Sequence, residues 1–315
     1  MSNKNLLSGR DKELQELAEQ YEAAMSENKP FYQDADELAD LADWYGTKKR
    51  YDKAFEIAEY GLKLHPDSTE LMIEYAYLHL DNGKKAKARE IIENLPDTYS
   101  PEAKVVRAHL LLSEGKLDDA EQLLDTIEDK ADLANVVDVS YMYLDMGYPD
   151  KALAWLDPVK EEYSDEEAYI AVVADCLYGK GMTEEAIPLY NRLIDMNPYS
   201  APYWFGLARC HFEEMNFNQA IDACDYALVG DDEFADAYVM KGHCFYQLGN
   251  EDAALEYYQK AEELHGLAPE FIYTYIGLCK VSKGEWKEGY ENLEKAILEN
   301  ETDEIASPIL PSLYA

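Results

Sequence analysis

The sequence predicts an all-α protein built from stacked helix-turn-helix units. Three observations support this fold class. A small residue recurs about every 34 positions, a glycine stands five residues before most of these, and apolar residues spaced three and four apart precede that glycine. No segment shows the two-residue alternation that is typical of a half-buried strand.

The repeated small residue defines the length of one unit. Its intervals are 34, 32, 32, 34, 34, 34 and 35 residues, so eight units cover residues 35–300. One helix pair of this length cannot bury both of its apolar faces, and neighbouring units must therefore stack. The recurring residues are Ala54, Ala88, Ala120, Ala152, Ala186, Ala220, Ala254 and Gly289.

The glycines that precede these residues mark the turn inside each unit. Glycine ends a helix because it adopts the left-handed backbone conformation without the steric cost that a side chain adds. Each unit therefore reads as a first helix, a tight turn and a second helix. The predicted turn glycines are Gly83, Gly115, Gly147, Gly181, Gly249 and Gly284.

The two ends differ from the repeats. Residues 1–34 form an N-terminal segment in which 11–27 predict an amphipathic helix that caps the first unit. Residues 301–315 form a proline-broken tail that is too short for a full capping helix, although it could begin a ninth unit. We expect this C-terminal end to associate with another copy or another protein.

These units resemble the tetratricopeptide repeat. The resemblance implies a right-handed superhelical solenoid whose first helices line a concave groove. Members of the family are mostly adaptors that hold peptides or protein partners in that groove. The match is closest at Trp204, Leu207, Ala208, Ala220, Ala227, Tyr238, Gly242, Ala254, Tyr258 and Ala261.

Composition limits the partners. The chain carries 28 Lys and Arg against 65 Asp and Glu, a formal charge of −37. This field repels phosphate backbones and anionic lipid, so we expect neither a nucleic-acid nor a membrane partner. An odd number of cysteines (five), and no apolar run long enough for a signal peptide or a membrane span, favour a cytoplasmic protein.

The cysteines follow the repeat. Cys176, Cys210, Cys244 and Cys279 are spaced by 34, 34 and 35 residues, one to a unit. Packed helices lie roughly 8–10 Å apart, whereas a disulfide needs Cα atoms within about 7 Å and zinc needs its sulfur ligands about 2.3 Å away. We therefore expect buried, small apolar side chains and no metal or cofactor.

No catalytic constellation is present in the sequence. There is no glycine-rich phosphate loop and no nucleophile motif, so we expect no enzyme. Among the histidines, only His109 and His243 stand on the predicted groove side, where they could contact a partner or respond to pH. His211 is expected to be a core ring that makes one hydrogen bond.

The repeat register also predicts a groove lining, apolar and aromatic with acidic spots at residues such as Asp138 and Asp145. Aromatic side chains anchor partners well because they contribute a large area for little rotamer entropy. The alternative, that several of these residues only pack between repeats, stays open. The predicted partner-binding residues are Tyr77, His109, Tyr141, Asp175, Tyr178, Phe205, Arg209, Phe212, His243 and Tyr246.

The sequence supports one leading hypothesis about function and two alternatives. The leading one is a non-enzymatic adaptor or scaffold that binds an unidentified protein or peptide with apolar or aromatic anchors and a basic side chain. Many co-chaperones of the family hold the terminal carboxylate of a peptide with several cationic side chains. Arg209 is the only cation in the predicted lining, so we do not expect a ligand that is held by its terminal carboxylate. The alternatives are a self-assembling module, with a homo-oligomer formed through the C-terminal end, and a regulatory repeat region of a longer protein.

Overall fold

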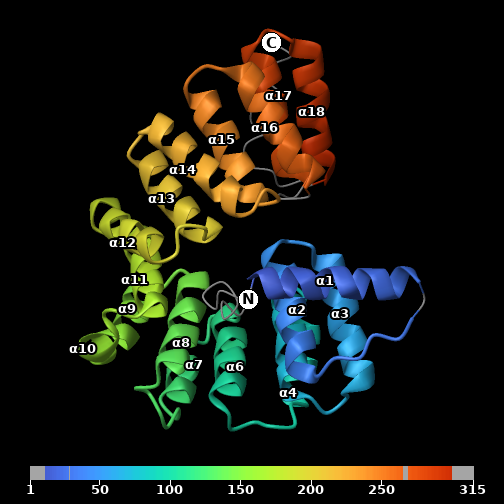
Figure 1. Ribbon diagram of the computed structural model, residues 1–315, viewed down its shortest axis with the longest axis vertical. Coiled ribbons are helices and arrows are strands. Elements are labelled where there is room, and N and C mark those ends of the chain that lie inside the picture. Colours follow the sequence, from blue (N-terminus) through green and yellow to red (C-terminus); the bar gives the residue numbers. More distant parts are fainter. Residues whose placement is uncertain (1–10, 28, 265–268, 300–315) are drawn as a thin grey trace. The chain divides into compact units, whose positions relative to one another are not determined.

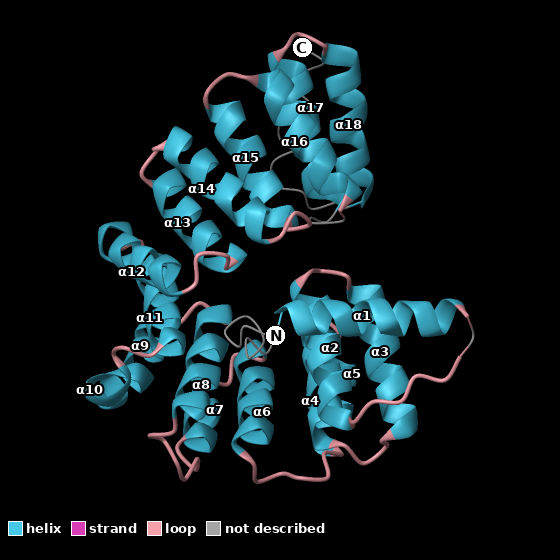
Figure 2. Cartoon of the chain, in the orientation of Figure 1, coloured by secondary structure: helices cyan, strands magenta, loops and turns pink. Residues whose placement is uncertain are grey.

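The protein is described by a computed structural model over residues 11–27, 29–264 and 269–299, and every regular element in these ranges is a helix. Figure 1 gives the order of the helices and Figure 2 shows that only loops and turns connect them. The chain divides into two compact units, residues 1–182 and 183–315, at the turn between α11 and α12.

The N-terminal unit consists of helix hairpins packed in chain order. The two helices of a hairpin contact each other, as α2 and α3 do, and each first helix also contacts the next, α2 with α4, α4 with α6, and α6 with α8. The helices are α1 (Asp11–Ser26), α2 (Ala35–Thr47), α3 (Tyr51–Leu64), α4 (Thr69–Asp81), α5 (Lys85–Glu93), α6 (Pro101–Ser113), α7 (Leu117–Leu124), α8 (Leu133–Asp145), α9 (Pro149–Leu156), the short 3₁₀ helix η1 (Asp157–Val159), α10 (Lys160–Tyr163) and α11 (Glu167–Gly179).

The C-terminal unit repeats the same packing. Its hairpins pair α13 with α14, α15 with α16, and α17 with α18, and the second helix of one hairpin contacts the first helix of the next. The helices are α12 (Thr183–Met196), α13 (Ala201–Glu213), α14 (Phe217–Gly230), α15 (Ala235–Gln247), α16 (Glu251–Glu263), α17 (Pro269–Ser282) and α18 (Trp286–Glu299).

The predicted turn glycines all adopt the left-handed conformation, with φ between 68° and 81°. The two hairpins without a glycine at this position place Lys49 (φ 59°) and Met215 (φ 58°) there instead. A side chain in this region of the backbone map is strained, by roughly 1 kcal/mol relative to glycine. The turn geometry is therefore imposed by helix packing and not by glycine alone.

The recurring small residues lie where the two helices of a hairpin approach most closely. All seven alanines of the series, from Ala54 to Ala254, are fully buried. At Gly289 an added Cβ would come within 2.7 Å of Val281 Cγ2. This spacing explains why the position tolerates only small residues, and it confirms the basis of the predicted repeat.

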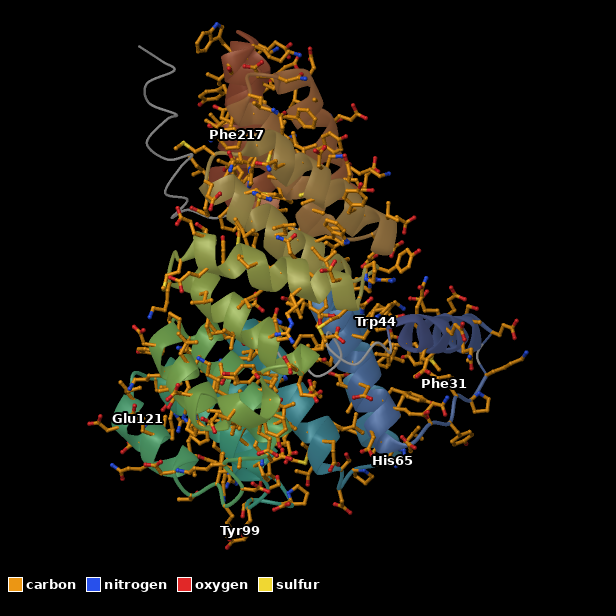
Figure 3. The ribbon with its side chains drawn as sticks, turned by 60° about the vertical axis from the view of Figure 1, so that its left-hand side comes forward. Phe31, Trp44, His65, Tyr99, Glu121 and Phe217 are labelled. Atoms are coloured by element: carbon orange, nitrogen blue, oxygen red, sulfur yellow. The ribbon has the colours of Figure 1, made fainter. Side chains whose placement is uncertain are left out.

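The N-terminal amphipathic helix is observed as α1. Leu14 and Tyr21 are buried against α2 and α3. The ring of Phe31, which Figure 3 labels in the segment between α1 and α2, meets the Tyr21 ring edge-on with centroids 5.4 Å apart. The apolar face of α1 therefore covers the first hairpin. The predicted C-terminal tail lies outside the described residues.

Candidate functional site

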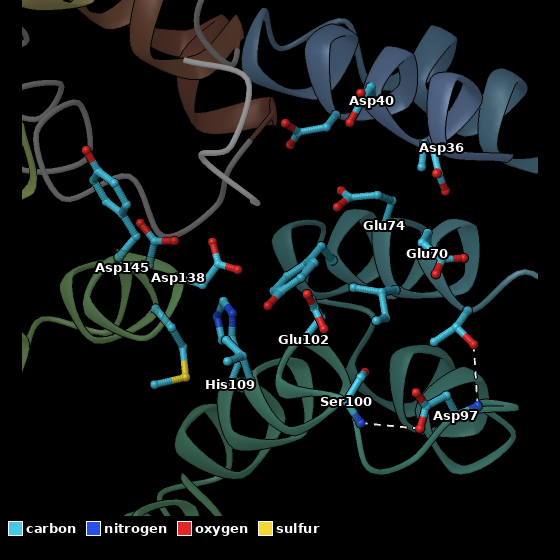
Figure 4. A pocket seen from close by; sticks show the side chains of 18 residues that line it. Asp36, Asp40, Glu70, Glu74, Asp97, Ser100, Glu102, His109, Asp138 and Asp145 are labelled. Carbon is cyan, nitrogen blue, oxygen red and sulfur yellow. Dashed lines mark hydrogen bonds between the residues drawn. The ribbon is translucent and has the colours of Figure 1, made fainter. Parts of the chain in front are cut away.

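Four successive first helices of the N-terminal unit line a pocket of about 450 Å³. The helices α2, α4, α6 and α8 supply most of its wall, and the loop before α6 supplies the rest. Figure 4 shows the pocket from close by. Its lining residues are Asp36, Ala39, Asp40, Asp43, Thr69, Glu70, Ile73, Glu74, Tyr77, Asp97, Ser100, Glu102, Val105, His109, Asp138, Tyr141, Met142 and Asp145.

The wall of this pocket is acidic. Among the lining residues that the structure describes, nine are Asp or Glu and none is Lys or Arg. On α2 the carboxylates of Asp36, Asp40 and Asp43 are spaced four and three residues apart, which places them on one face of the helix. The helices α4, α6 and α8 add one or two carboxylates each, so stacking gathers charges from four helices around one cavity.

Loop residues complete the wall. The Asp97 carboxylate accepts hydrogen bonds from the backbone N–H groups of Tyr99 (2.8 Å) and Ser100 (3.2 Å). The backbone N–H of Asp97 donates to the Thr69 hydroxyl at 3.4 Å, and Figure 4 draws this bond and the one to Ser100. These bonds tie the loop before α6 to the start of α4 and hold one carboxylate at the rim.

The floor of the pocket is apolar and aromatic. Ile73, Val105 and Met142 are buried. The Tyr77 ring is also buried, and its centroid lies 5.6 Å from that of His109. The Tyr141 hydroxyl donates to Asp175 at 3.3 Å. The site therefore combines a charged wall with a floor that can contact the apolar part of a side chain.

His109 is the buried polar group of the floor. Its side chain is 7% exposed, and its Nδ1 has no hydrogen-bond partner among the described residues. Burial lowers the pKa of the imidazole to about 4, so the ring is neutral at pH 7. Figure 4 shows the ring rising from α6 toward the acidic wall. A neutral imidazole there offers one acceptor and one donor.

The structure brings three of the predicted groove residues together in this pocket, namely Tyr77, His109 and Tyr141. Asp175 and Tyr178 stand on α11 and are not among its lining residues. Sequence analysis missed most of the acidic wall, although a signal existed. Asp43 stands one repeat before Tyr77, in the same position of its unit.

The predicted groove residues of the C-terminal unit pack against their neighbours. The Phe205 ring meets Phe234 edge-on at 5.2 Å, and the Arg209 guanidinium lies 5.7 Å from the Phe205 ring centroid. Arg209 also donates to the Tyr190 hydroxyl at 3.3 Å.

Phe212, His243 and Tyr246 belong to the same pattern. The Phe212 ring lies 5.5 Å from Phe217 and 6.3 Å from His243, and Tyr246 packs on the buried cluster of α15, α16 and α17. These contacts match the alternative in which such residues pack between repeats.

His243 occupies the same repeat position as His109 but is satisfied. Its Nδ1 is hydrogen-bonded to the Tyr258 hydroxyl at 2.7 Å, and its ring lies 4.4 Å from that of Tyr275. Burial lowers its pKa to about 4 as well. His211 differs from its prediction, since it is half-buried and its Nδ1 has no hydrogen-bond partner among the described residues.

The cysteines behave as predicted. All five are buried and none forms a disulfide among the described residues, and burial raises the thiol pKa of Cys176, Cys244 and Cys279 to about 12. Within the described ranges, no three His, Cys, Asp or Glu side chains are arranged to hold a metal ion. None of the described helices is both long and apolar enough to cross a membrane.

Two family models match parts of the chain. Residues 47–108 match the tetratricopeptide repeat, and residues 179–261 match the anaphase-promoting complex, cyclosome, subunit 3. No curated protein matches the sequence.

Solved structures show the same fold at low identity. The APC/C hetero-tetramer Cut9-Hcn1 has a TM-score of 0.59 and 15% identity, and the match covers 89% of this chain but only 56% of that one. A tetratricopeptide repeat protein from Parabacteroides merdae has a TM-score of 0.54 and 18% identity, with coverages of 78% and 98%. A thermophilic repeat protein from Thermus thermophilus has a TM-score of 0.50 and 16% identity, with coverages of 58% and 99%.

The solved structures share the all-helical fold described above. The predicted all-α solenoid of tetratricopeptide-like repeats is confirmed. The chain therefore has the fold of tetratricopeptide-repeat proteins, and residues 47–108 match the family model of that repeat.

Proposed function

We propose that the protein is a scaffold without catalytic activity, which binds a segment of a partner protein in the groove formed by its first helices. One observation carries this proposal. The pocket of the N-terminal unit is lined by the first helices of four consecutive repeats, and it contains Tyr77, His109 and Tyr141 from a single row of the repeat register. A partner segment lying along this row would contact each repeat in turn.

The similarity to known proteins supports an interaction role in general. One matched model describes a subunit of the anaphase-promoting complex, and one similar structure is a hetero-tetramer of that complex. Because that solved structure is a hetero-tetramer, assembly into a larger complex is part of the proposal. Fold alone does not name the partner.

Site-specific cross-linking tests the groove. A photo-reactive phenylalanine analogue at Tyr141, which lines the pocket, would be compared with the same analogue at Tyr226, an exposed residue of the second helix α14. After irradiation in lysate of the source cells, we expect discrete adducts from position 141 and none of the same proteins from position 226. If both positions gave the same adducts, the groove would not be the binding site.

The self-assembly alternative rests on residues 301–315, which lie outside the described residues. Repulsion between copies that each carry a formal charge of −37 opposes it at low ionic strength. Sedimentation velocity at low and high salt distinguishes the alternatives. A scaffold of the proposed kind sediments as a monomer in both conditions.

A further inference from the structure

We propose that a basic cluster at the turn edge of the N-terminal unit binds a short, carboxylate-rich segment of a partner protein. The cluster stands in and after the turn between α4 and α5 and in the turn between α6 and α7. None of its members is among the pocket-lining residues that the structure describes, so it forms a second surface beyond the proposed groove. The basic cluster consists of Lys84, Lys85, Lys87, Arg89 and Lys116.

Contacts between two neighbouring hairpins hold the basic cluster together. The Lys85 ammonium donates a hydrogen bond to the backbone carbonyl of Ser113, at the end of α6. Arg89 and Lys116 share the carboxylate of Glu114, which lies 2.9 Å from the Lys116 Nζ atom. The turn after α6 therefore lies beside the start of α5, and the cations of both hairpins belong to one surface.

Positive charge is in excess in the basic cluster. In the described part of the chain, two carboxylates pair with its five cations, namely Glu90 and Glu114. The Lys84 ammonium lies 5.4 Å from the ring centroid of Phe55, and the Lys85 ammonium donates to a neutral carbonyl. Both lysines are exposed. An anion can therefore approach ammonium groups whose charge no carboxylate neutralises.

The titration of His79 reflects the same positive charge. This residue of α4 is 7% exposed, and its ring centroid lies 5.0 Å from that of Phe55. Burial lowers the pKa of the imidazole, and Lys84 and Lys87 lower it further, each by more than Glu59 raises it. The electrostatic potential at this ring is therefore positive, although the chain carries a formal charge of −37.

The lysines of α5 stand where they destabilise their own helix. The positive end of the helix dipole lies at the first turn, which favours anions there and disfavours cations. The helices α3, α7, α9, α12, α16 and α18 have Asp or Glu in this turn, whereas α5 has Lys85 and Lys87 and no acidic residue. Natural proteins break such local rules mainly at functional sites. An anionic partner removes this unfavourable interaction.

Carboxylates beside the cluster limit the length of the ligand. Further along the same edge, α7 begins with Asp118 and Asp119, and α9 has Asp150 in its first turn. A nucleic acid or an anionic membrane extends beyond the cluster and meets these groups, whereas a segment of a few residues does not. Exposed charges more than about 8 Å apart are largely screened at physiological salt, so distant carboxylates repel a short segment only weakly.

These constraints select a segment of a different protein. A second copy of this chain is disfavoured, because its whole charge of −37 would approach the same charge here. Aspartate or glutamate side chains supply carboxylates that pair with ammonium groups, and such pairs form charge-assisted hydrogen bonds. The fitting occupant is an acidic stretch of a few residues.

Peptide binding to the full chain tests the proposal. The probe is a fluorescein-labelled, end-blocked peptide in which glutamate and alanine alternate, and the control peptide has glutamine in place of each glutamate. Fluorescence anisotropy at 100 mM salt compares wild type with two variants that each lose three positive charges. Lys84→Gln/Lys85→Gln/Lys87→Gln alters the basic cluster, and Lys63→Gln/Lys160→Gln/Lys287→Gln alters exposed lysines of α3, α10 and α18.

We expect wild type to bind the glutamate peptide and not the glutamine peptide. The cluster variant is expected to raise Kd about tenfold or more and the matched variant less than about threefold, since a tenfold change corresponds to about 1.4 kcal/mol. A charge-keeping variant, Lys84→Arg/Lys85→Arg/Lys87→Arg, is expected to bind within about threefold of wild type. Equal losses in the two glutamine variants would show that only net charge matters, and the proposal would fall. It would also fall if wild type bound neither peptide.

A single-stranded oligonucleotide with the same number of negative charges separates two classes of anion. We expect it to bind more weakly than the glutamate peptide, because its length brings it close to the carboxylates of α7 and α9. Equal or tighter binding that depends on the same three lysines would assign the surface to nucleic acid and overturn the proposal. The groove keeps its own readout, the cross-links from position 141, and the loss of either result leaves the other unchanged.

Discussion

His109 and His243 stand at the same position of their repeats, 134 residues apart, yet their surroundings differ. His243 is held by the Tyr258 hydroxyl within an aromatic cluster of the C-terminal unit. His109 faces the acidic pocket of the N-terminal unit with Nδ1 unpartnered among the described residues. The same repeat register thus produces a hydrogen-bonded, partly buried histidine in one unit and a pocket-lining histidine in the other.

Tyr258 explains part of this difference, and removing it has the largest expected effect. The side chain is 1% exposed and packs on His243 and Tyr275. We expect Tyr258→Ala to lower the free energy of unfolding of the C-terminal unit by about 3–5 kcal/mol, because it leaves a large cavity. Urea unfolding followed by circular dichroism measures the loss.

Tyr258→Phe is the matched control. It keeps the ring but leaves His243 without its partner, as His109 is, so we expect a smaller loss of about 1–2 kcal/mol. If both substitutions lowered the free energy of unfolding by the same amount, the hydrogen bond to His243, and not the packing of the ring, would stabilise the cluster.

The pH dependence of the free energy of unfolding compares the two histidines directly. Both have a pKa lowered to about 4, with burial as the main cause, whereas an unfolded imidazole titrates near 6.5. The unfolded chain therefore takes up protons first as the pH falls. The stability linked to each histidine is complete above pH 6.5 and decreases by up to about 3 kcal/mol as the pH approaches 4.

Between pH 7 and pH 5, the free energy of unfolding of wild type falls. We expect it to fall by about 2 kcal/mol less in His109→Gln, and likewise in His243→Gln. Denaturant titrations at the two pH values give this difference. The protonation of carboxylates elsewhere cancels in the comparison with wild type. Variants whose stability falls in parallel with wild type would show that the histidines do not titrate as described.

The strained turns offer the smallest expected change. Met215 in the C-terminal unit and Lys49 in the N-terminal unit adopt positive φ where other hairpins have glycine. We expect Met215→Gly and Lys49→Gly each to raise the free energy of unfolding by up to about 1 kcal/mol, because the strain exceeds the added entropy of the unfolded chain. Thermal unfolding detects the change. Gly249→Ala, at the same turn position, should do the opposite.

Much of the fold was predictable because its determinants are local and repeated. Ala88 and Gly83 recur with their neighbours in unit after unit, and each has a single physical role, close helix contact or a left-handed turn. The cysteine series was predictable for the same reason. The division of the chain into two compact units left no signal in that pattern, since Gly181 adjoins the boundary and looks like the other turn glycines.

The candidate site was only partly predictable, because it is formed by side chains from several helices that meet only after the repeats stack. Asp43 and Glu102 look like ordinary surface carboxylates within their own helices, and only stacking brings them to one cavity. Phe205 and Phe212 were predicted from the same register to contact a partner. Their rings pack on Phe234 and Phe217 but stay partly exposed, so the partner contact stays a prediction. Periodicity places a side chain on a face, whereas its neighbours decide whether it is accessible.

The most direct test of the difference between the two units is the imidazole ¹⁵N spectrum of the full chain, compared between wild type and Tyr258→Phe. His109→Gln and His243→Gln assign the two rings. We predict that Tyr258→Phe shifts the ring nitrogen resonances of His243, which loses its hydrogen bond, and leaves those of His109 unchanged. Unchanged His243 resonances, or equal shifts at both rings, would contradict the assignment of the difference to the Tyr258 hydroxyl.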